Sequence, residues 1–475
     1  MDCSADSSIF RGRGGLGDVL KVAFPLIVAS LVHAVNLFTD RMMLAAYSPL
    51  AMAAAFSAGL TSFTLSCIFL GTVGYAGVFV AQYTGAKEHD KVAQAVWQAV
   101  FLALLGGAFL AGTSFFADEL FRLFGHDPEI QPMEATYYRI LSLAGAIPLV
   151  MTALSVFWSG RAKTAMIMEV NLTVTLCNIP LNYLLIFGPT FRIGRFALHF
   201  PEMGIAGAAW GTAGAAAIGL AVYLIAFLLP SNRRIFAPFR HIFAPKLFVQ
   251  LLRYGLPTGL QLGQDLVTFN IFIILLGKIS APVLTACGAV FSIYSLAFNP
   301  MIGFGQTASI LVGQGVGAND IPFAERSVRS ASLLLVGYSA LMAAVFLLFP
   351  EMFNRIFSLP PGEVRRLTRI MLLLTAAYML FDGMNVLFSN AVKGAGDTCF
   401  VMIVGLILGW GVFALPCMAA YWYLSGPGVA RFGVEQAQEL CVWTLWSIMM
   451  TYITLLGGIF FFRYRGGKWK TMRVI

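Results

Sequence analysis

Long apolar segments alternate with short polar ones along almost the whole chain. Each apolar segment has about 20 residues or more, enough for an α-helix to cross the roughly 30 Å hydrocarbon core of a bilayer. Because lipid offers no partners to backbone N–H and C=O groups, such segments cross as helices. The pattern therefore predicts an all-α polytopic membrane protein with twelve transmembrane helices. The expected spans are 19–45, 51–81, 93–116, 136–158, 165–187, 204–229, 251–277, 284–312, 328–349, 368–390, 400–424 and 440–462.

The two halves of this pattern repeat each other. The segment GTVGYAGVFVAQYTGAKEHDKVAQAV (71–96) aligns with GFGQTASILVGQGVGANDIPFAERSV (303–328) at a constant offset of 232, with seven identical positions. The same offset places Pro25 on Pro257. Six spans separate the two prolines, so both halves have the same orientation in the membrane. Parallel repeats of this kind occur in secondary transporters. The sequence contains no Walker A motif, which would indicate transport driven by ATP.

The repeat divides the chain into two lobes of six helices. The first sixteen residues lack the apolar core of a signal peptide, so we expect the first hydrophobic segment to remain in the protein. The expected parts are an N-terminal tail at 1–18, an N-lobe at 19–236, a linker at 237–250, a C-lobe at 251–462 and a basic tail at 463–475.

Composition agrees with a membrane protein and excludes other classes. Of the 475 residues 59% are hydrophobic and only 11% are charged, whereas soluble chains carry roughly 25% charged residues. The net charge of +9 would suit a nucleic-acid binder, but the basic residues do not gather with aromatic residues on a soluble domain, so we exclude nucleic acid as a partner. The seven cysteines are scattered singly without metal-ligand spacing and are interpreted as small core residues.

Basic residues concentrate in alternate connections between the spans. An even number of spans puts both termini on one side, and most of the 31 lysines and arginines fall on that side, including those of the tail RYRGGKWKTMR. The positive-inside rule then places both termini in the cytoplasm.

Four acidic residues fall inside the expected spans: Asp40, Glu169, Asp265 and Asp382. A carboxylate at membrane depth is expensive and usually faces a protein-lined or wet cavity. Glu169 lies near the start of its span, close to Lys163, and is interpreted as an interfacial residue. The other three are candidates for binding a proton or a metal cation.

Asp382 and Asp265 both have neighbours that suit a cation site. Tyr378 lies four residues before Asp382 and Asn385 three after it, so the three side chains share one helix face. A bare carboxylate there needs a cation or proton to compensate its charge; the alternative is a structural aspartate bonded to backbone or to Asn385. Near Asp265, the side chains of Gln261 and Gln264 offer further oxygen ligands, which hard cations prefer.

Two further candidates lie on the first span. Asp40 is followed by Arg41, but adjacent residues on a helix do not face each other, so a direct ion pair is not assured. Two interpretations of Asp40 therefore stay open: handling of substrate or of a proton, and structural pairing at the end of the span. His33 corresponds through the repeat to Asp265, which suggests a proton role, although a lone buried histidine is more often a satisfied core residue.

Several short motifs occur in a fixed order along the chain. They are FPLIVASLVHAVNLFTD (24–40), VAQYTGA (80–86), NIPLNYLLIFG (178–188), EMGIAGAAWGT (202–212), YGLPTGL (254–260), VGQGVGA (312–318) and NAVKGAGDT (390–398). On these motifs the chain resembles the MATE family of multidrug and toxic compound extrusion transporters over nearly its whole length. The resemblance implies two six-helix lobes arranged as a V around a central cavity. It also implies export of organic cations or drugs against entering H⁺ or Na⁺ by rocker-switch alternating access.

The resemblance assigns roles to four residues of the N-lobe. Asp40 matches the family's span-1 aspartate. Asn178 and Asn182 match two span-5 polar positions of an N-lobe proton site, and Thr212 matches its span-6 hydroxyl. The archaeal-type members carry an aspartate where Asn182 stands, so this site lacks one carboxylate.

In the C-lobe the resemblance is to the bacterial sodium-coupled branch. Asp382 and Tyr378 match that branch's span-10 acid and its cation-facing tyrosine, and Asp265 stands where the branch has a glutamate. The resemblance therefore implies a Na⁺ site at Asp265 and Asp382, with one arm shortened by a methylene group.

We therefore expect a secondary active antiporter rather than an enzyme, with no cofactor beyond a coupling ion, H⁺ or Na⁺. The expected substrate is a small amphipathic cation, and the expected setting is a monomer in the lipid of a bacterial inner membrane. Two alternatives belong to the same superfamily: a flippase for lipid-linked precursors and a narrow-substrate metabolite exporter. The acidic in-span charges argue against the strongly cationic cavity of a flippase. A membrane-embedded prenyl transferase would need clustered acids for Mg²⁺-diphosphate, and the sequence has no DDxxD-like cluster.

Overall fold

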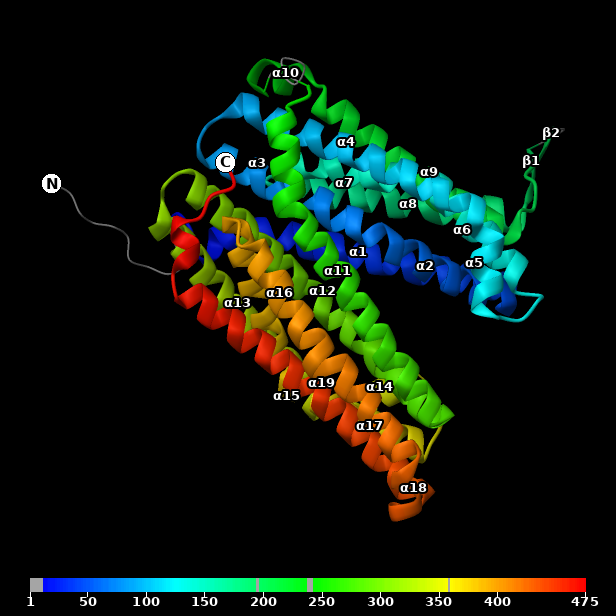
Figure 1. Cartoon of the computed structure of the whole chain (residues 1–475). Helices are drawn as coiled ribbons and strands as arrows, with labels where there is room; N and C mark the ends of the chain where they lie inside the picture. The colour runs from blue at the N-terminus through cyan, green and yellow to red at the C-terminus, as the bar shows by residue number, and fades with distance from the viewer. Residues whose placement is uncertain (1–11, 194–195, 237–241, 358) are drawn as a thin grey trace. The chain divides into compact units, whose positions relative to one another are not determined.

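The computed structural model describes residues 12–193, 196–236, 242–357 and 359–475, and nearly all of its regular structure is helical (Figure 1). Eleven helices or helix runs are long and apolar enough to cross a membrane, and the pair α6 and α7, bent by 41° at a short break, makes a twelfth candidate. This confirms the expected all-α polytopic fold. Parts of the expected N-terminal tail (1–11, with Cys3) and of the expected linker (237–241) lie outside the described residues.

The helices of the first half that form candidate spans are α1 (Leu16–Tyr47), α2 (Pro49–Gly74) with α3 (Ala76–Gly85), α4 (His89–Thr113) with η1 (Ser114–Phe116) and α5 (Ala117–Phe124), α6 (Gln131–Leu143) with α7 (Ala146–Ser159), α8 (Ala165–Phe187) and α9 (Gly204–Phe227). Those of the second half are α11 (Pro245–Ile279), α12 (Ala281–Gly317), α13 (Ile321–Leu348), α15 (Glu363–Ala395), α16 (Thr398–Leu408) with the π-helical η2 (Gly409–Ala414) and α17 (Leu415–Ser425), and α19 (Val434–Arg465). The short helices are α10 (Pro230–Phe236), α14 (Pro350–Ile356), α18 (Pro427–Phe432) and η3 (Lys468–Thr471).

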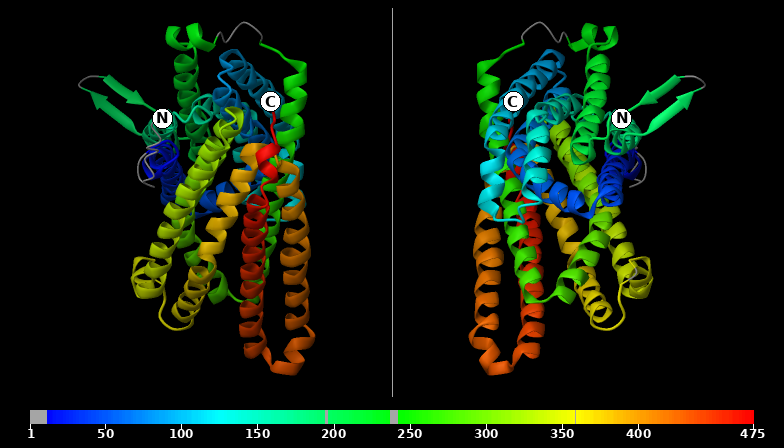
Figure 2. Two further views of the ribbon diagram at one scale, coloured as in Figure 1. Left: turned by 90° about the vertical axis from the view of Figure 1, so that its left-hand side faces the viewer. Right: turned by 90° about the vertical axis from the view of Figure 1, so that its right-hand side faces the viewer.

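One strand pair interrupts the helical pattern. Strands β1 (Thr190–Ile193) and β2 (Phe196–His199) pair antiparallel, with Thr190 opposite His199, and form a projecting hairpin between α8 and α9 (Figure 2). The Thr190 hydroxyl and His199 Nδ1 are 2.8 Å apart. The hydropathy pattern predicted only a connection between two spans at this place, because a hairpin of this length is too short to show in a span-sized window.

The chain forms two compact units. We call Val28–Leu260 with Val474–Ile475 the N unit, and Gln261–Arg473 with the described residues up to Ile27 the C unit. In the N unit, α8 packs on α9, α4 on α7 and α2 on α6; in the C unit, α15 packs on α12, α13 and α19. Helices α1 and α11 each belong partly to one unit and partly to the other.

The local backbone reproduces the repeat seen in the sequence. Ser48 and Ser280, separated by the offset of 232, are both N-caps whose side chains accept a hydrogen bond from the N–H three residues on. Lys87 and Asn319, separated by the same offset, both adopt left-handed conformations, with φ of 61° and 58°. Because a positive φ is uncommon for residues other than glycine, its recurrence at equivalent turns indicates that the chain follows the same local path in both halves.

Candidate functional site

In the N unit, four predicted site residues from three helices meet around one carboxylate. Asp40 of α1 is buried, and Asn182 Nδ2 on α8 donates to its Oδ1 at 2.6 Å. The same amide donates to Asn178 Oδ1, one turn earlier, at 3.1 Å. Thr212 of α9 lies beside Asp40. We call these four residues the N site.

The N site contains several unsatisfied polar atoms. Asn178 Nδ2, Asn182 Oδ1 and Thr212 Oγ1 are buried without a hydrogen-bond partner among the described residues, and each such atom costs about 1–3 kcal/mol. Gly211 leaves room for the amide, because a Cβ at that position would collide with Asn182 Oδ1. The group therefore offers both donors and acceptors to a further ligand next to a carboxylate.

Arg41 lies within electrostatic range of Asp40 but forms no salt bridge with it. Its guanidinium lies over the ring of Phe56, 5.1 Å from the centroid, and within the described chain Asp40 forms no salt bridge. The exposed side chains of Glu169 and His33 have no hydrogen bond or salt bridge to the N site either. Asp40 is therefore a buried acid whose hydrogen-bond partner, Asn182, is neutral.

In the C unit, Asp382 of α15 is the centre of a second group. It is 6% exposed, the hydroxyl of Tyr294 on α12 donates to its Oδ2, and Asn385 Nδ2 donates to its Oδ1 at 3.3 Å. Tyr378, one turn before Asp382, is fully buried, and its ring centroid lies 5.9 Å from that of Tyr294. Among the residues that the structure describes, Asp382 has no salt-bridge partner.

Asp265 on α11 belongs to the same neighbourhood. Its carboxylate forms no hydrogen bond or salt bridge with a described residue. Lys393 of α15 lies within electrostatic range of Asp265, and Tyr452 of α19 lies within range of both Asp265 and Asp382. We call Asp265, Asp382, Tyr294, Tyr378 and Tyr452 the C site.

Two amide side chains adjoin the C site. A Cβ on Gly405 of α16 would lie 3.5 Å from Gln261 Cγ and 3.6 Å from Gln264 Oε1, so both side chains pack against α16. Gln261 Oε1 and both polar side-chain atoms of Gln264 are buried without a partner among the described residues. The π-helical turn η2 follows directly after α16, and such turns frequently accompany functional sites. These amides are available to a ligand near Asp265.

Sequence reasoning missed Tyr294, Tyr452 and Lys393. Lys393 lies beyond the expected span 368–390 and was therefore expected in a connection, but α15 continues to Ala395. It follows Asp382 by eleven residues, about three helical turns, so a longer helix would have placed both on one face. For Tyr294 the sequence holds no such signal, because the repeat places a serine, Ser62, at the equivalent position.

In the described part of the chain, no group of three or more His, Cys, Asp or Glu residues has the arrangement of a metal-binding cluster. The acids at the N and C sites stand singly or as a pair, among hydroxyls and amides. Such a set can take a proton or a weakly held hard cation, because hydroxyl and amide oxygens are suitable further ligands for both.

A family model described as MatE matches residues 25–184 and 265–418, which include Asp40, Asp265 and Asp382. The probable multidrug resistance protein NorM of Rhizobium meliloti (strain 1021) is 25% identical over 441 residues, covering 90% of this chain and 93% of that protein. Its namesake from Pseudomonas putida is 28% identical over 423 residues, covering 86% and 88%. The multidrug resistance protein PmpM of Pseudomonas aeruginosa is 25% identical over 415 residues, covering 85% and 83%.

Solved structures share the fold. An outward-facing multidrug resistance MATE family transporter of the MOP superfamily superposes with a TM-score of 0.82 over 99% of this chain and 100% of that one, at 15% identity. The eukaryotic MATE transporter AtDTX14 gives a TM-score of 0.79 over 96% of each chain, at 16% identity. At these identities the likeness concerns the fold alone.

Proposed function

The chain belongs to the MatE family, and on this premise we propose that it is a secondary active antiporter that exports small organic cations or drugs in exchange for H⁺ or Na⁺. Membership confirms two expectations from the sequence: the chain is a membrane transporter, and it is not an enzyme. The substrate class is carried over from relatives whose names describe multidrug resistance.

The observation that carries the proposal is the environment of Asp382. This carboxylate is buried in a membrane-crossing helix, accepts hydrogen bonds from a hydroxyl and an amide, and has no salt-bridge partner in the described chain. Neutral donors orient a carboxylate but do not cancel its charge. An ionised carboxylate in that position requires a mobile positive charge, and a proton or Na⁺ arriving from outside would supply it.

Binding of the coupling ion must differ between two states of the transporter for exchange to occur. In our proposal, a proton or Na⁺ at Asp265 and Asp382 favours the state that releases substrate outward, and loss of the ion favours the state that accepts substrate. Lys393 compensates Asp265 while the ion is away, since the two lie within electrostatic range. Rocker-switch alternating access is the motion we propose between these states.

The oxygen-rich composition of the C site favours Na⁺ as the coupling ion. Sodium is a hard cation that prefers several oxygen ligands, and the C site and the adjoining amides contain carboxylate, phenol and amide oxygens. The N site has one carboxylate and an asparagine at position 182. We propose that Asp40, with Asn178, Asn182 and Thr212, handles the substrate or a proton there.

We further propose that the protein is a monomer in the cytoplasmic membrane of a bacterium, with both termini in the cytoplasm. The relatives described above from Rhizobium and Pseudomonas support a bacterial setting. The excess of lysine and arginine in alternate connections supports the orientation.

Reconstituted transport with separately imposed ion gradients tests this proposal. Ethidium uptake into inverted vesicles is measured with an inward-directed or outward-directed gradient of H⁺ alone and of Na⁺ alone. Antiport predicts that ethidium accumulates only with the gradient of one ion in one direction. Equal uptake with no gradient would contradict coupling.

A flippase for lipid-linked precursors is the runner-up. It would need a strongly cationic cavity for pyrophosphate, and the only basic residue that the described structure places near the C-site acids is Lys393. A single lysine beside two aspartates favours binding of cations over binding of a pyrophosphate. Absence of dye transport under both gradients would make the flippase, or a narrow-substrate exporter, the better account.

A further inference from the structure

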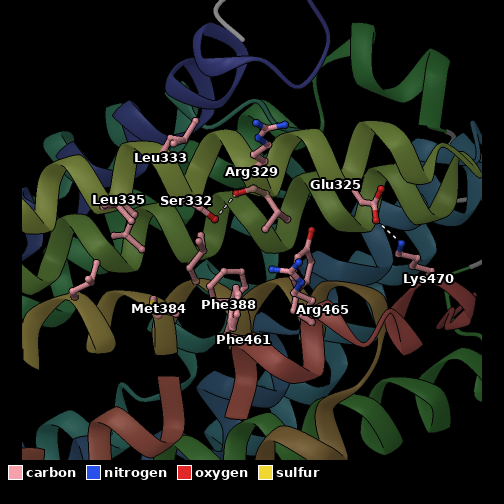
Figure 3. A pocket seen from close by; sticks show the side chains of 15 residues that line it. Glu325, Arg329, Ser332, Leu333, Leu335, Met384, Phe388, Phe461, Arg465 and Lys470 are labelled. Carbon is pink, nitrogen blue, oxygen red and sulfur yellow. Dashed lines mark hydrogen bonds and ion pairs between the residues drawn. The ribbon is translucent and has the colours of Figure 1, made fainter. Parts of the chain in front are cut away.

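A groove of about 570 Å³ runs along the outside of the C unit between α13 and α19 (Figure 3). Both helices pack on α15, which provides the floor. The floor residues Leu380, Met384 and Leu387 lie on the face of α15 roughly opposite that of Tyr378 and Asp382, as the 100° step per residue requires. The groove is therefore separate from the C site.

The groove is apolar over most of its length. Leu333 and Val336 of α13 are 48% and 44% exposed, and Phe388 and Phe461 pack with ring centroids 5.2 Å apart. The lining residues of α13 run from 325 to 336, about 16 Å at 1.5 Å per residue. This length is close to half of the roughly 30 Å hydrocarbon core, the thickness of one leaflet.

One end of the groove is basic. Arg329, Arg465 and Lys470 line it there, with one acid, Glu325, whose carboxylate is 2.5 Å from Lys470 Nζ. Figure 3 shows Glu325 and Lys470 at this end, with Leu335 and Met384 toward the other. Within the described chain neither Arg329 nor Arg465 has a salt-bridge partner, so three bases face one acid.

Aromatic residues of the kind enriched at membrane interfaces lie at this end. The ring of Tyr464, which lines the groove, stacks on Trp469 with centroids 5.2 Å apart and planes 9° apart. Tyr and Trp are enriched where bilayer meets water. With the interface at this end, the charges would stand at headgroup depth and the apolar walls at acyl-chain depth.

We propose that this groove binds an anionic phospholipid of the surrounding membrane. Its phosphate lies among Arg329, Arg465 and Lys470, and an acyl chain lies along the apolar walls. Charge complementarity selects the headgroup, since basic pockets between transmembrane helices suit anionic lipid headgroups. The length of the groove, close to one leaflet, favours a lipid, because a soluble anion would leave the apolar walls uncovered. The proposal does not depend on the coupling ion or on the exported substrate.

Lipid binding to the purified full-length protein, followed by native mass spectrometry, tests the proposal. Phosphatidylglycerol and phosphatidylcholine are titrated separately, and the affinity of the first bound lipid is measured. We expect wild-type protein to prefer phosphatidylglycerol at least about tenfold. The double variant Arg329→Gln with Arg465→Gln removes two interfacial charges and is expected to lower the affinity for phosphatidylglycerol about 30-fold. Binding of phosphatidylcholine should change little.

Three further variants separate the groove from general effects. Arg234→Gln with Lys246→Gln removes two exposed charges from the N unit and should leave the preference intact. Glu325→Gln removes the one acid among the described residues that line the groove and should strengthen phosphatidylglycerol binding severalfold, a gain that misfolding cannot produce. Ser332→Trp fills the groove from α13 without changing its charge and should lower the affinity for both lipids.

Several results would overturn the proposal. One is unchanged phosphatidylglycerol affinity in Arg329→Gln with Arg465→Gln. An equal loss in the N-unit control would mean unspecific surface attraction. Binding of glycerol phosphate as tight as that of the whole lipid would mean a soluble-anion site.

Discussion

At the residue scale, the chemistry of this transporter centres on carboxylates whose hydrogen-bond partners are neutral. Asn182 donates to Asp40, and Tyr294 and Asn385 donate to Asp382. Arg41, adjacent in sequence to Asp40, lies over an aromatic ring instead. An acid inside an apolar segment is rare enough to be found from the sequence alone. Its neutral partners come from other helices, and they could not be identified because uncharged residues are common in every span.

Gly211→Ala is predicted to damage the N site without touching its polar atoms. The new Cβ would collide with Asn182 Oδ1, so the amide must move away from Asp40. Overpacking of this kind costs about 1–3 kcal/mol, and we expect lower thermal stability and reduced ethidium transport. Gly214→Ala is the matched control on the same helix, because its Cβ would lie 3.6 Å from Leu181 Cδ1, an ordinary contact. Equal behaviour of the two variants would contradict a close fit at Asn182.

Tyr294→Phe is predicted to shift the ion dependence of transport. It removes the hydroxyl that donates to Asp382 Oδ2, and a hydrogen bond to a charged group contributes about 1.5–3 kcal/mol. Because this bond stabilises the ionised carboxylate, its loss makes Asp382 take up a proton more readily, and the proton dependence of transport should shift to lower proton concentration by about tenfold or more. Tyr338→Phe is the control, since that hydroxyl donates to the neutral Ala297 carbonyl at 2.9 Å. A shift of the same size in Tyr338→Phe would mean that packing of the tyrosines, rather than the bond to Asp382, matters.

At the scale of elements, the sequence predicts where helices cross the membrane better than where they break. All twelve expected apolar segments correspond to a candidate span because hydropathy alone decides which segments are long and apolar enough to cross a bilayer. The bend between α6 and α7 and the π-helical turn in 409–414 depend on side-chain packing, which hydropathy does not record. Helix ends also shift: α15 continues to Ala395, five residues beyond the apolar segment, and this shift brings Lys393 into the helix.

The left-handed turns at Ala162 and Gly396 allow a prediction about thermal stability. The segments GRAKT (160–164) and GAGDT (394–398) align at an offset of 234, two more than the offset of the earlier segments. Within them, Ala162 has φ of 57° and its equivalent, Gly396, has φ of 120°. A left-handed conformation costs an L-residue about 1–2 kcal/mol. Ala162→Gly should therefore raise the apparent melting temperature slightly, while Gly396→Ala should lower it. The reverse order in a thermal unfolding assay would contradict the equivalence of the two turns.

At the scale of the whole molecule, the distribution of lysine and arginine supports the orientation that we propose. The hydropathy pattern and the repeat together predict the fold class, and the family match confirms it. Side-chain partners such as Tyr294 and Tyr452, by contrast, are set by packing among helices that are distant in sequence. A single sequence does not show which of these helices lie side by side.

Site-directed labelling tests the proposed orientation. Lys468→Cys and Glu129→Cys place thiols at two exposed positions, in a background where Cys3 and Cys399 are serine. A membrane-impermeant maleimide should label the cysteine at position 129 in intact cells and the cysteine at position 468 only after the membrane is opened. Labelling in the opposite order would reverse the topology.

The most direct test of the central claim is gradient-driven ethidium transport by Asp382→Asn in reconstituted vesicles. The account predicts that the variant is produced and folded as wild type but no longer accumulates ethidium in response to the coupling-ion gradient. Glu169→Gln is the matched control, because it neutralises an exposed acid outside both sites and should transport as wild type. Wild-type accumulation by Asp382→Asn under the same gradient would contradict the assignment of ion coupling to Asp382.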